Sequence, residues 1–556
     1  MRRLRPPVVC EHLRIAALFL FVLGTNLFSQ DAPPPQPSPK KIQGTVINSV
    51  TKEPIQRALV YTSDSRFATL TDDHGHFEFN FVVNPSGDAA AYFENTLSSR
   101  RPGYFESSTQ ATGEDITIAL VPEASIIGRI SVPNVSDMDR MTVSIYRRQV
   151  TEGRSRWTRL NDVLVRSNGD FRVTNLAAGT YKIFTNEALD RDPLTFDPNG
   201  PFYGYPPIYF PAATNFATAA TIELTPGQTF QVTLSPTRQA YYPVNIPVVQ
   251  SGEEGQVDVV VSQGSQRGPG FTLGYDAQQH AIIGSLPNGN YTVEAVTGNV
   301  TPQSGAVHIS VRDAPLAGPA LTLVPVNFVS LNIDDQRTTP PSEGRAVVRR
   351  GRSVQLQSVA GSSLVPVEDF GLATPIPIDY TRSGFPAARP GRYWLRLNAS
   401  NGYIASARSG NVDLLREPLT VGMGGSLPPI EVILRDDLAQ LEGTVEGLQK
   451  KPASQLVPRR SGLYSGVLGV SAYIYCLPLP DESGQFHQIF AQQDGTFADQ
   501  QMPPGSYRVL AFDREQPELD WRNPEAMRAY ESKGQVIHLA PGQKEHLRLQ
   551  LITTEQ

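Results

Sequence analysis

The chain has 556 residues, enough for three to five domains of about 100–200 residues each. Its 45 glycines and 47 prolines favour short strands and turns over long helices, because proline breaks helices and glycine weakens them. The formal net charge of −6 argues against a nucleic-acid partner, since phosphate binding requires a dense basic surface.

The N-terminus has the pattern of a secretion signal. Three arginines stand among the first five residues, the apolar run Ile15–Leu23 follows, and Ser29 and Gln30 end it with small or polar side chains. The run is shorter than the roughly 20 apolar residues of a membrane span. We therefore expect a signal peptide at residues 1–30, with an uncleaved anchor as the alternative. The product would be exported, periplasmic, cell-surface or extracellular, with no transmembrane segment after cleavage.

A proline-rich segment comes next. Residues 31–41 read DAPPPQPSPKK, and five prolines in eleven residues favour an extended polyproline conformation. We interpret this segment as a linker that holds the first domain away from the processing site.

A hairpin theme then repeats along the chain. Asn-Gly or Asp-Gly tolerates the positive φ of a type I′ turn, and a later Gly-x-Tyr combines a second tight turn with the start of an alternating strand. Tyrosine suits a core edge near a turn because its ring is apolar and its tip is polar. We interpret these residues as hairpin determinants rather than catalytic groups. Parts of the theme occur in Asp73–Phe77, Asn168–Tyr181, Leu286–Tyr291, Pro390–Tyr393 and Asp494–Tyr507.

Further strands close each repeat. Short alternating strands at this spacing, with turn signals between them, indicate β-sandwiches. The strands expected at these positions are Asp115–Leu120, Thr221–Leu224, Phe230–Leu234, Ala320–Val324, Pro429–Leu434 and Leu547–Leu551. The predicted fold class is therefore all-β, a tandem array of about five β-sandwich domains with very little helix.

One helix is expected, at Pro524–Ser532. Asn523 is a favourable N-cap, Pro524 suits the first helical position, and Glu525 suits the positive end of the helix dipole. The strand Gln535–Leu539 follows.

The closing strands and the unit lengths of about 80–120 residues divide the chain after the linker into five sandwiches. The boundaries are 42–121, then 122–236 with an aromatic loop, then 237–325, 326–435, and 436–556 with the short helix.

After the signal, Cys476 is the single cysteine, so no intrachain disulfide can form. It lies in the strand-like run Ala472–Leu477. We expect it to be a small buried hydrophobic side chain.

The first domain resembles the carboxypeptidase regulatory-like domain, a transthyretin- or prealbumin-like β-sandwich. The resemblance rests on Gly44-Thr45-Val46, Glu53-Pro54-Ile55, Ala58-Leu59-Val60, Thr71–Phe77 and Pro102-Gly103-Tyr104. It covers residues 42–121 and is fainter at 124–190 and 440–512. The whole chain looks like a secreted bacterial multidomain protein of such modules. The resemblance implies prealbumin-like or immunoglobulin-like sandwiches, a non-catalytic role, and kinship with a carbohydrate-binding-like fold.

Signatures of catalysis are absent from the sequence. It has no His-x-x-Glu, no Gly-x-Ser-x-Gly and no phosphate-binding loop. His74 and His76 flank Gly75 beside Asp72 and Asp73, and we interpret them as turn residues rather than metal ligands, because no third ligand is evident. We expect no catalytic residue, no metal and no cofactor.

Aromatic residues supply the candidate ligand-binding site. Pro201–Pro211 reads PFYGYPPIYFP, and aromatic faces can stack on sugar rings or receive proline-rich peptides. The alternative is a loop that packs its rings over its own sandwich. The candidate ligand-binding residues are Phe202, Tyr203, Tyr205, Tyr209 and, in a separate loop, Trp521.

These observations predict a non-enzymatic exported protein that acts as an extended envelope or extracellular scaffold or adhesion module. Its partner would be a glycan or a cell-envelope protein. The alternatives are a carbohydrate-binding protein that uses exposed aromatics and a hydrolase of unrecognised type.

Overall fold

A computed structural model describes much of the chain. The described residues are 39–63, 67–82, 96–110, 115–132, 141–189, 202–250, 256–264, 268–298, 302–338, 359, 361–367, 375–399, 401–422, 427–448, 471–479 and 484–553. The expected signal peptide, most of the linker and the basic stretch 450–460 lie outside them. The described part is all-β, as predicted, with one short helix.

Two sheets face each other in the first unit, in the strand orders β4-β1-β7 and β3-β2-β5-β6. The strand β1 begins at Pro39, three residues before the expected boundary. The strands are β1 (Pro39–Asn48), β2 (Leu59–Thr62), β3 (Ala68–Leu70), β4 (His76–Val82), β5 (Thr96–Arg100), β6 (Ser107–Gln110) and β7 (Asp115–Leu120).

The second unit has the sheets β11-β8-β16 and β10-β9-β12-β15, and its strands β13 and β14 pair with the first sheet of the third unit. Its strands are β8 (Ala124–Ile130), β9 (Thr142–Thr151), β10 (Arg154–Leu164), β11 (Asp170–Leu176), β12 (Gly179–Thr185), β13 (Ala188–Leu189), β14 (Phe202–Tyr205), β15 (Ile222–Leu224) and β16 (Thr229–Leu234).

The third unit joins β13 and β14 to its own strands in the order β13-β14-β17-β20-β19, opposite β18-β21-β22-β25. Its strands are β17 (Gln239–Val249), β18 (Val257–Gln263), β19 (Gly274–Asp276), β20 (Ala281–Pro287), β21 (Gly289–Thr297), β22 (Gln303–Val311), β23 (Leu316–Ala317), β24 (Leu321–Thr322) and β25 (Val324–Pro325).

The fourth unit has the sheets β29-β26-β34-β31-β32 and β28-β27-β30-β33. Its strands are β26 (Asn327–Asp335), β27 (Ser363–Pro366), β28 (Ile376–Pro377), β29 (Gly384–Ala388), β30 (Gly391–Arg396), β31 (Tyr403–Ser409), β32 (Val412–Asp413), β33 (Leu419–Val421) and β34 (Ile430–Arg435).

In the fifth unit the strands join into one path, β37-β36-β39-β41-β35-β38, with β40 beside β39. Its elements are β35 (Ala439–Glu446), β36 (Ala472–Pro478), β37 (His487–Ala491), β38 (Thr496–Met502), β39 (Gly505–Phe512), α3 (Pro524–Met527), η3 (Arg528–Tyr530), β40 (Gln535–Leu539) and β41 (Lys544–Ile552).

One topology recurs in all five units. The first strand pairs antiparallel with a later strand on one side and parallel with a closing strand on the other. Each unit also contains its own cluster of buried apolar side chains, drawn from one contiguous stretch of the chain. Alternation produces these cores: in β7, Ile116, Ile118 and Leu120 are buried while the residues between them are exposed.

A glycine of the first strand receives a phenylalanine ring in three of the units. A Cβ on Gly443 would lie 2.8 Å from Phe497 Cζ and 2.1 Å from the Leu547 carbonyl oxygen. Gly44 meets Phe77, and Gly128 meets Phe171, in the same way. Because no side chain fits there, the glycine of the first strand and the phenylalanine two residues after the Gly of the later turn are two halves of one contact.

The tyrosine of the hairpin theme caps its own turn. In four units a buried tyrosine donates its hydroxyl to the carbonyl oxygen four residues earlier, which satisfies a backbone group that the turn leaves unpaired. The pairs are Tyr181 to Ala177 at 2.5 Å, Tyr291 to Pro287 at 2.9 Å, Tyr393 to Arg389 at 2.9 Å and Tyr507 to Pro503 at 2.6 Å.

We expect Tyr507→Phe to destabilise the fifth unit by about 1–3 kcal/mol, because it leaves the buried Pro503 carbonyl without its donor. Urea denaturation followed by tryptophan fluorescence measures this, with Trp521 as the reporter in that unit. Tyr203→Phe is the matched control, since the Tyr203 ring is partly exposed and its hydroxyl has no hydrogen bond to a described residue. Equal midpoints for the two variants would contradict the role of the tyrosine.

The helix is shorter than predicted. Asn523 caps it by accepting a hydrogen bond from the Glu525 amide, as expected, but α3 ends at Met527 and continues as the 3₁₀ turn η3. Cys476 is fully buried, and burial raises the pKa of its thiol.

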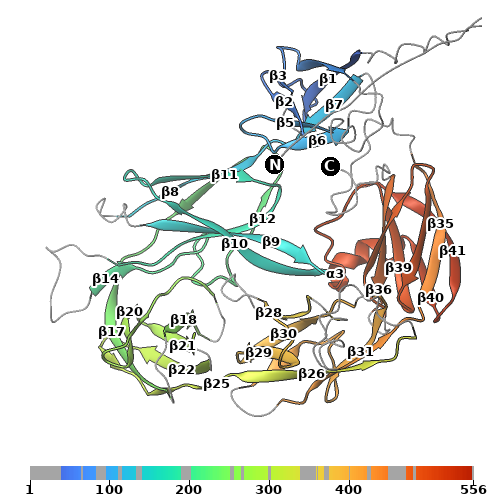
Figure 1. The fold of residues 1–556 in the computed structure, drawn as a ribbon. Helices are drawn as coiled ribbons and strands as arrows, with labels where there is room; N and C mark the ends of the chain where they lie inside the picture. The colour runs from blue at the N-terminus through green and yellow to red at the C-terminus, as the bar shows by residue number, and fades with distance from the viewer. Residues whose placement is uncertain are drawn as a thin grey trace, which may run out of the picture.

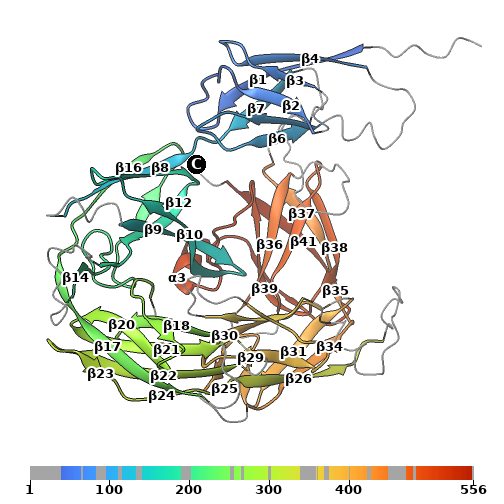
Figure 2. The same cartoon turned by 60° about the vertical axis from the view of Figure 1, so that its left-hand side comes forward.

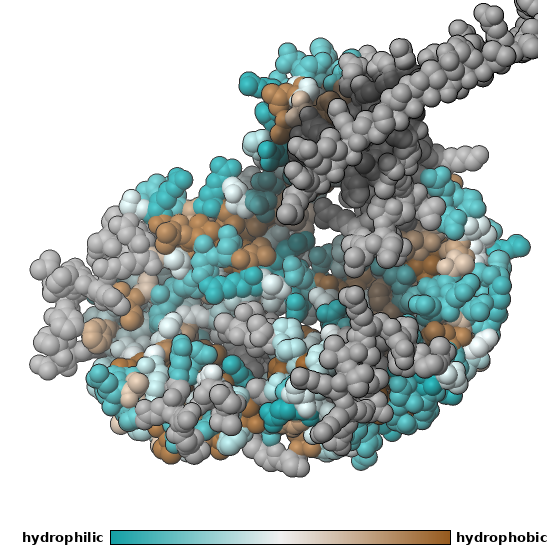
Figure 3. Space-filling view, in the orientation of Figure 1, coloured by the Kyte–Doolittle hydropathy of each residue, from teal (hydrophilic) through white to brown (hydrophobic). Residues whose placement is uncertain are grey.

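The second to fifth units follow one another around a ring, and the first unit stands apart from it (Figures 1 and 2). The hairpin of β9 and β10 reaches across toward α3 of the fifth unit. The expectation of an extended scaffold is therefore wrong for these four units. The described surface is mostly hydrophilic in one view, with an apolar area over the second unit (Figure 3).

A carboxyl group is enclosed where the second and third units meet. Glu187 follows β12, and its Oε2 accepts a hydrogen bond from the Thr272 amide of the third unit at 3.1 Å. Burial raises the pKa of Glu187 to about 7, because that bond offsets only part of the lost hydration. An acid whose pKa is higher in the folded chain than in the unfolded chain favours folding at low pH.

We therefore expect the native chain to lose about 1–3 kcal/mol of stability as pH rises from about 4.5 to about 7, because over this range Glu187 is ionised in the unfolded chain and still largely protonated in the folded chain. Glu187→Gln should remove this dependence, so its stability relative to the native chain should increase with pH. Urea denaturation at pH 5 and pH 8 measures the difference. Parallel pH profiles for the two proteins would contradict the assignment.

Candidate functional site

The β9–β10 hairpin is the element that closes the ring. Thr151 pairs with Arg154, so only Glu152 and Gly153 form the turn. Both have positive φ, 53° and 71°, which a two-residue type I′ hairpin turn requires. The strands are long, with ten and eleven residues, and they carry this turn away from the core of their own unit.

The backbone of the turn bonds to the fifth unit. The Arg522 amide donates to the Gly153 carbonyl at 3.0 Å, and Arg522 Nε donates to the Glu152 carbonyl at 3.2 Å. Gly153 also packs directly against the Trp521 ring, since a Cβ on Gly153 would fall 2.2 Å from the indole Cε2. Glycine is therefore required twice at this position, for the turn and for the contact.

Charged side chains of the hairpin bond to the fourth and fifth units. Glu152 Oε1 pairs with Arg396 Nε of β30 at 2.7 Å. Arg148 Nη2 pairs with the buried Asp520 Oδ2 at 2.8 Å. We call the contacts of residues 147–154 with the fourth and fifth units the clasp.

Arg154 occupies a special place in the clasp. Its guanidinium carbon lies 3.4 Å from the centroid of the Trp394 ring, so the planar group stacks on the indole. Burial and the neighbouring Arg522 lower the pKa of Arg154 to about 9, at which it still carries its charge at neutral pH. Within the described residues, it has neither a hydrogen-bond acceptor nor an ion-pair partner.

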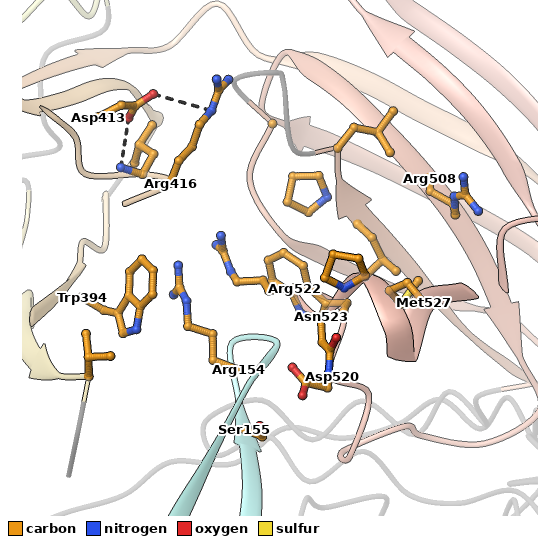
Figure 4. A pocket seen from close by; sticks show the side chains of 18 of the residues that line it. Arg154, Ser155, Trp394, Asp413, Arg416, Arg508, Asp520, Arg522, Asn523 and Met527 are labelled. Carbon is orange, nitrogen blue, oxygen red and sulfur yellow. Dashed lines mark hydrogen bonds and ion pairs between the residues drawn. The ribbon is translucent and has the colours of Figure 1, made fainter. Parts of the chain in front are cut away.

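A cavity of about 860 Å³ lies between the clasp, the fourth unit and the fifth unit (Figure 4). That volume is within the roughly 300–1,000 Å³ range of small-ligand sites. Five arginines and three carboxylates line it, together with two indoles, hydroxyl groups and an apolar wall. The residues that line the cavity include Arg154, Ser155, Trp394, Ser406, Arg408, Asp413, Leu415, Arg416, Leu477, Arg508, Asp520, Trp521, Arg522, Asn523, Met527 and Glu531.

The positive charge of the cavity is only partly neutralised. Arg416 pairs with Asp413 at 3.6 Å, and Asp520 is held by Arg148. Arg508 donates to the Tyr530 carbonyl. Arg522 lies open to the cavity, yet the protein packed around it removes part of its water and lowers its pKa. The arrangement can bind an anion.

Trp521 is the predicted site residue that lines this cavity. Its ring stacks on Phe486 at 5.3 Å with an interplanar angle of 10°, and Gly153 covers it as well. Trp521 therefore supports the clasp and is not an open stacking platform.

The aromatic loop lies elsewhere, between the second and third units. Phe202 and Tyr203 are 37% exposed each, and the Arg238 guanidinium lies over the Tyr203 ring at 4.3 Å. Tyr205 and Tyr209 are buried, at 1% and 3%. These two rings fit the alternative interpretation, a loop that packs its rings over its own sandwich.

Tyr209 is buried because its ring stacks on Phe184 and its hydroxyl donates to the Pro269 carbonyl. The structure does not bring the loop residues and Trp521 together. A ligand role for Phe202, Tyr203 and Trp521 stays a prediction.

Sequence reasoning missed Arg154, Arg522 and the role of Trp394. Arg522 and Glu152 are 370 positions apart, so no local spacing shows that they meet. The sequence held only weak signals of this contact, which were a Glu-Gly turn between long strands and an arginine next to Trp521.

The other polar candidates are structural. The Asp72 carboxylate accepts hydrogen bonds from the His74 and His76 amides, which fixes the turn. Across the residues that the structure describes, no group of three or more His, Cys, Asp or Glu could hold a metal ion. No helix in the described ranges is long and apolar enough to cross a membrane.

Comparisons with known proteins give remote similarities. No protein-family model matches the chain, and no curated protein matches its sequence. Among solved structures, the Bacillus anthracis TIE protein is 15% identical at a TM-score of 0.15, over 51% of this chain and 50% of that one, so the match spans half of that protein. A streptococcal ancillary pilin is 10% identical to this chain at a TM-score of 0.18, and the match covers 51% of this chain and 100% of the pilin. The pilus adhesin SpaC of Lactobacillus rhamnosus GG is 10% identical to this chain at a TM-score of 0.16, and the match covers 51% of this chain and 43% of SpaC.

We expect Gly153→Leu to open the ring, because any side chain at this position collides with Trp521. Small-angle X-ray scattering of the full chain should show a larger radius of gyration than that of the native chain.

Gly542→Leu is the matched control, since Gly542 has the same φ of 71° and no neighbour within 4 Å of its would-be Cβ. It imposes the backbone strain without the collision, so it should leave the radius unchanged. An unchanged radius in Gly153→Leu would contradict the closed arrangement.

Proposed function

We propose that this chain is an exported, non-enzymatic binding protein, a scaffold or adhesion module of the cell envelope. The observation that carries the proposal is the clasp. It holds three units of the chain around one cavity whose polar groups are mainly guanidinium groups, which bind anions by charge and by paired N–H donors.

The carboxylates of the cavity favour binding over hydrolysis. Asp413 and Asp520 are each in an ion pair, with Arg416 and Arg148. Glu531 is exposed at the rim. Two carboxylates that work as an acid and a base usually differ in environment, with at least one of them buried and unpaired. The described lining offers arginines for holding a ligand rather than such a pair.

The expected domain division and family kinship form part of the proposal. The five contiguous cores support five units with the boundaries given above. The equivalent glycine–phenylalanine contacts of the first, second and fifth units support the resemblance to carboxypeptidase regulatory-like domains. Export rests on the signal-like pattern of residues 1–30.

Co-sedimentation of the purified full chain with the cell-envelope fraction of its own organism tests the proposal. We expect saturable binding, with no release of reducing sugar ends or peptide fragments from the envelope material. A chain that stays in the supernatant, or one that degrades the material, would overturn it.

A further inference from the structure

The strongest unassigned feature is a pair of neighbouring arginines in the cavity. Arg154 reaches it from β10 and Arg522 from the segment before α3. Figure 4 shows both guanidinium groups projecting into the cavity between Trp394 and the fifth unit. The two groups are both cations, and burial together with the charge of Arg522 lowers the pKa of Arg154.

No carboxylate of the described chain balances this pair. Arg522 donates only to a backbone carbonyl, and Arg154 has no acceptor. Glu152 attracts both of them, but its carboxylate is paired with Arg396 at 2.7 Å. Three guanidinium groups therefore share one carboxylate, and the excess positive charge faces the cavity.

Stacking on Trp394 fixes the plane of the Arg154 guanidinium and leaves its N–H edge available. A planar guanidinium presents two parallel N–H donors, and this geometry matches the two oxygens of a carboxylate. Little side-chain entropy remains to be lost when a ligand binds, because the stack already orders the group.

We propose that the cavity binds a small carboxylate-bearing ligand, with Arg154 as the bidentate anchor and Arg522 as the second cation. The inference rests on the proposed binding function and specifies its ligand chemistry. A singly charged group suits the site better than a phosphate dianion, since Asp413, Asp520 and Glu531 also line the cavity and would repel a second negative charge.

The rest of the lining fits the body of such a ligand. Ser155, Ser406 and Asn523 can exchange hydrogen bonds with hydroxyl or amide groups, and Leu415, Leu477 and Met527 form apolar wall. Both an acidic sugar and an acidic peptide carry the required carboxylates.

Titration calorimetry on the purified full chain tests the site with three probes: trigalacturonate, triglutamate and the neutral trisaccharide maltotriose. We expect one of the two carboxylate probes to bind, with an affinity that falls as salt rises. Maltotriose should bind at least tenfold more weakly. Trigalacturonate would identify an acidic sugar as the source of the carboxylate, and triglutamate an acidic peptide.

Two variants locate the binding. Arg154→Gln should weaken it at least tenfold, and Arg154→Lys should weaken it less, because the charge stays while the fork is lost. Arg159→Gln, on the same strand but outside the cavity, is the control and should bind like the native chain. Thermal melting and scattering of each variant show whether the ring remains closed.

Three results would overturn the proposal. In the first, neither carboxylate probe binds. In the second, an Arg154→Gln variant that is folded and closed binds as tightly as the native chain, and in the third, maltotriose binds as tightly as the carboxylate probes. The envelope co-sedimentation can succeed when these fail, so the two proposals are tested separately.

Discussion

The contact of one two-residue turn with one indole closes the ring of four sandwiches. Glu152 and Gly153 can meet Trp521 because both have positive φ and the second of them has no side chain. The turn then places its carbonyls on Arg522, its carboxylate on Arg396, and the next residue, Arg154, on Trp394. Without this contact, the second unit would be held less firmly to the fourth and fifth units, because contacts between domains are usually small and polar.

The clasp is built mainly from interactions that are each weak at a surface. An exposed ion pair contributes about 0–1 kcal/mol, and a stacked guanidinium about 0.5–2 kcal/mol. Several of them act together here, and loss of Arg148 would leave the buried carboxylate of Asp520 unpaired, which costs more than the loss of an exposed pair. Contacts this weak would allow a ligand to enter the cavity by loosening the clasp. Once bound to Arg154, an anion would strengthen the clasp, because it would reduce the repulsion between Arg154 and Arg522.

The sequence was informative about the units and silent about the ring. The hairpin turns, the buried tyrosines and the N-cap Asn523 are local features, and their spacing along the chain is enough to predict them. The Gly443 and Phe497 motifs were visible, but their mutual contact depends on strand pairing. The cavity joins residues near positions 150, 390 and 520, and no periodicity relates them. For the aromatic loop the sequence left two readings open, exposed rings or packed rings, and Tyr205 and Tyr209 pack inside.

The distance between the hairpin tip and the fifth unit is the most direct test of this account. Spin labels at Thr151 and Glu531, both exposed, with Cys476 replaced by alanine, report it by electron–electron double resonance in the full chain. The closed ring predicts one narrow distance distribution, as narrow as that of a reference pair at Thr151 and Thr233 within the second unit. A broad distribution extending to long distances would show that the second and fifth units are not held together, and neither the ring nor its cavity would then exist in solution.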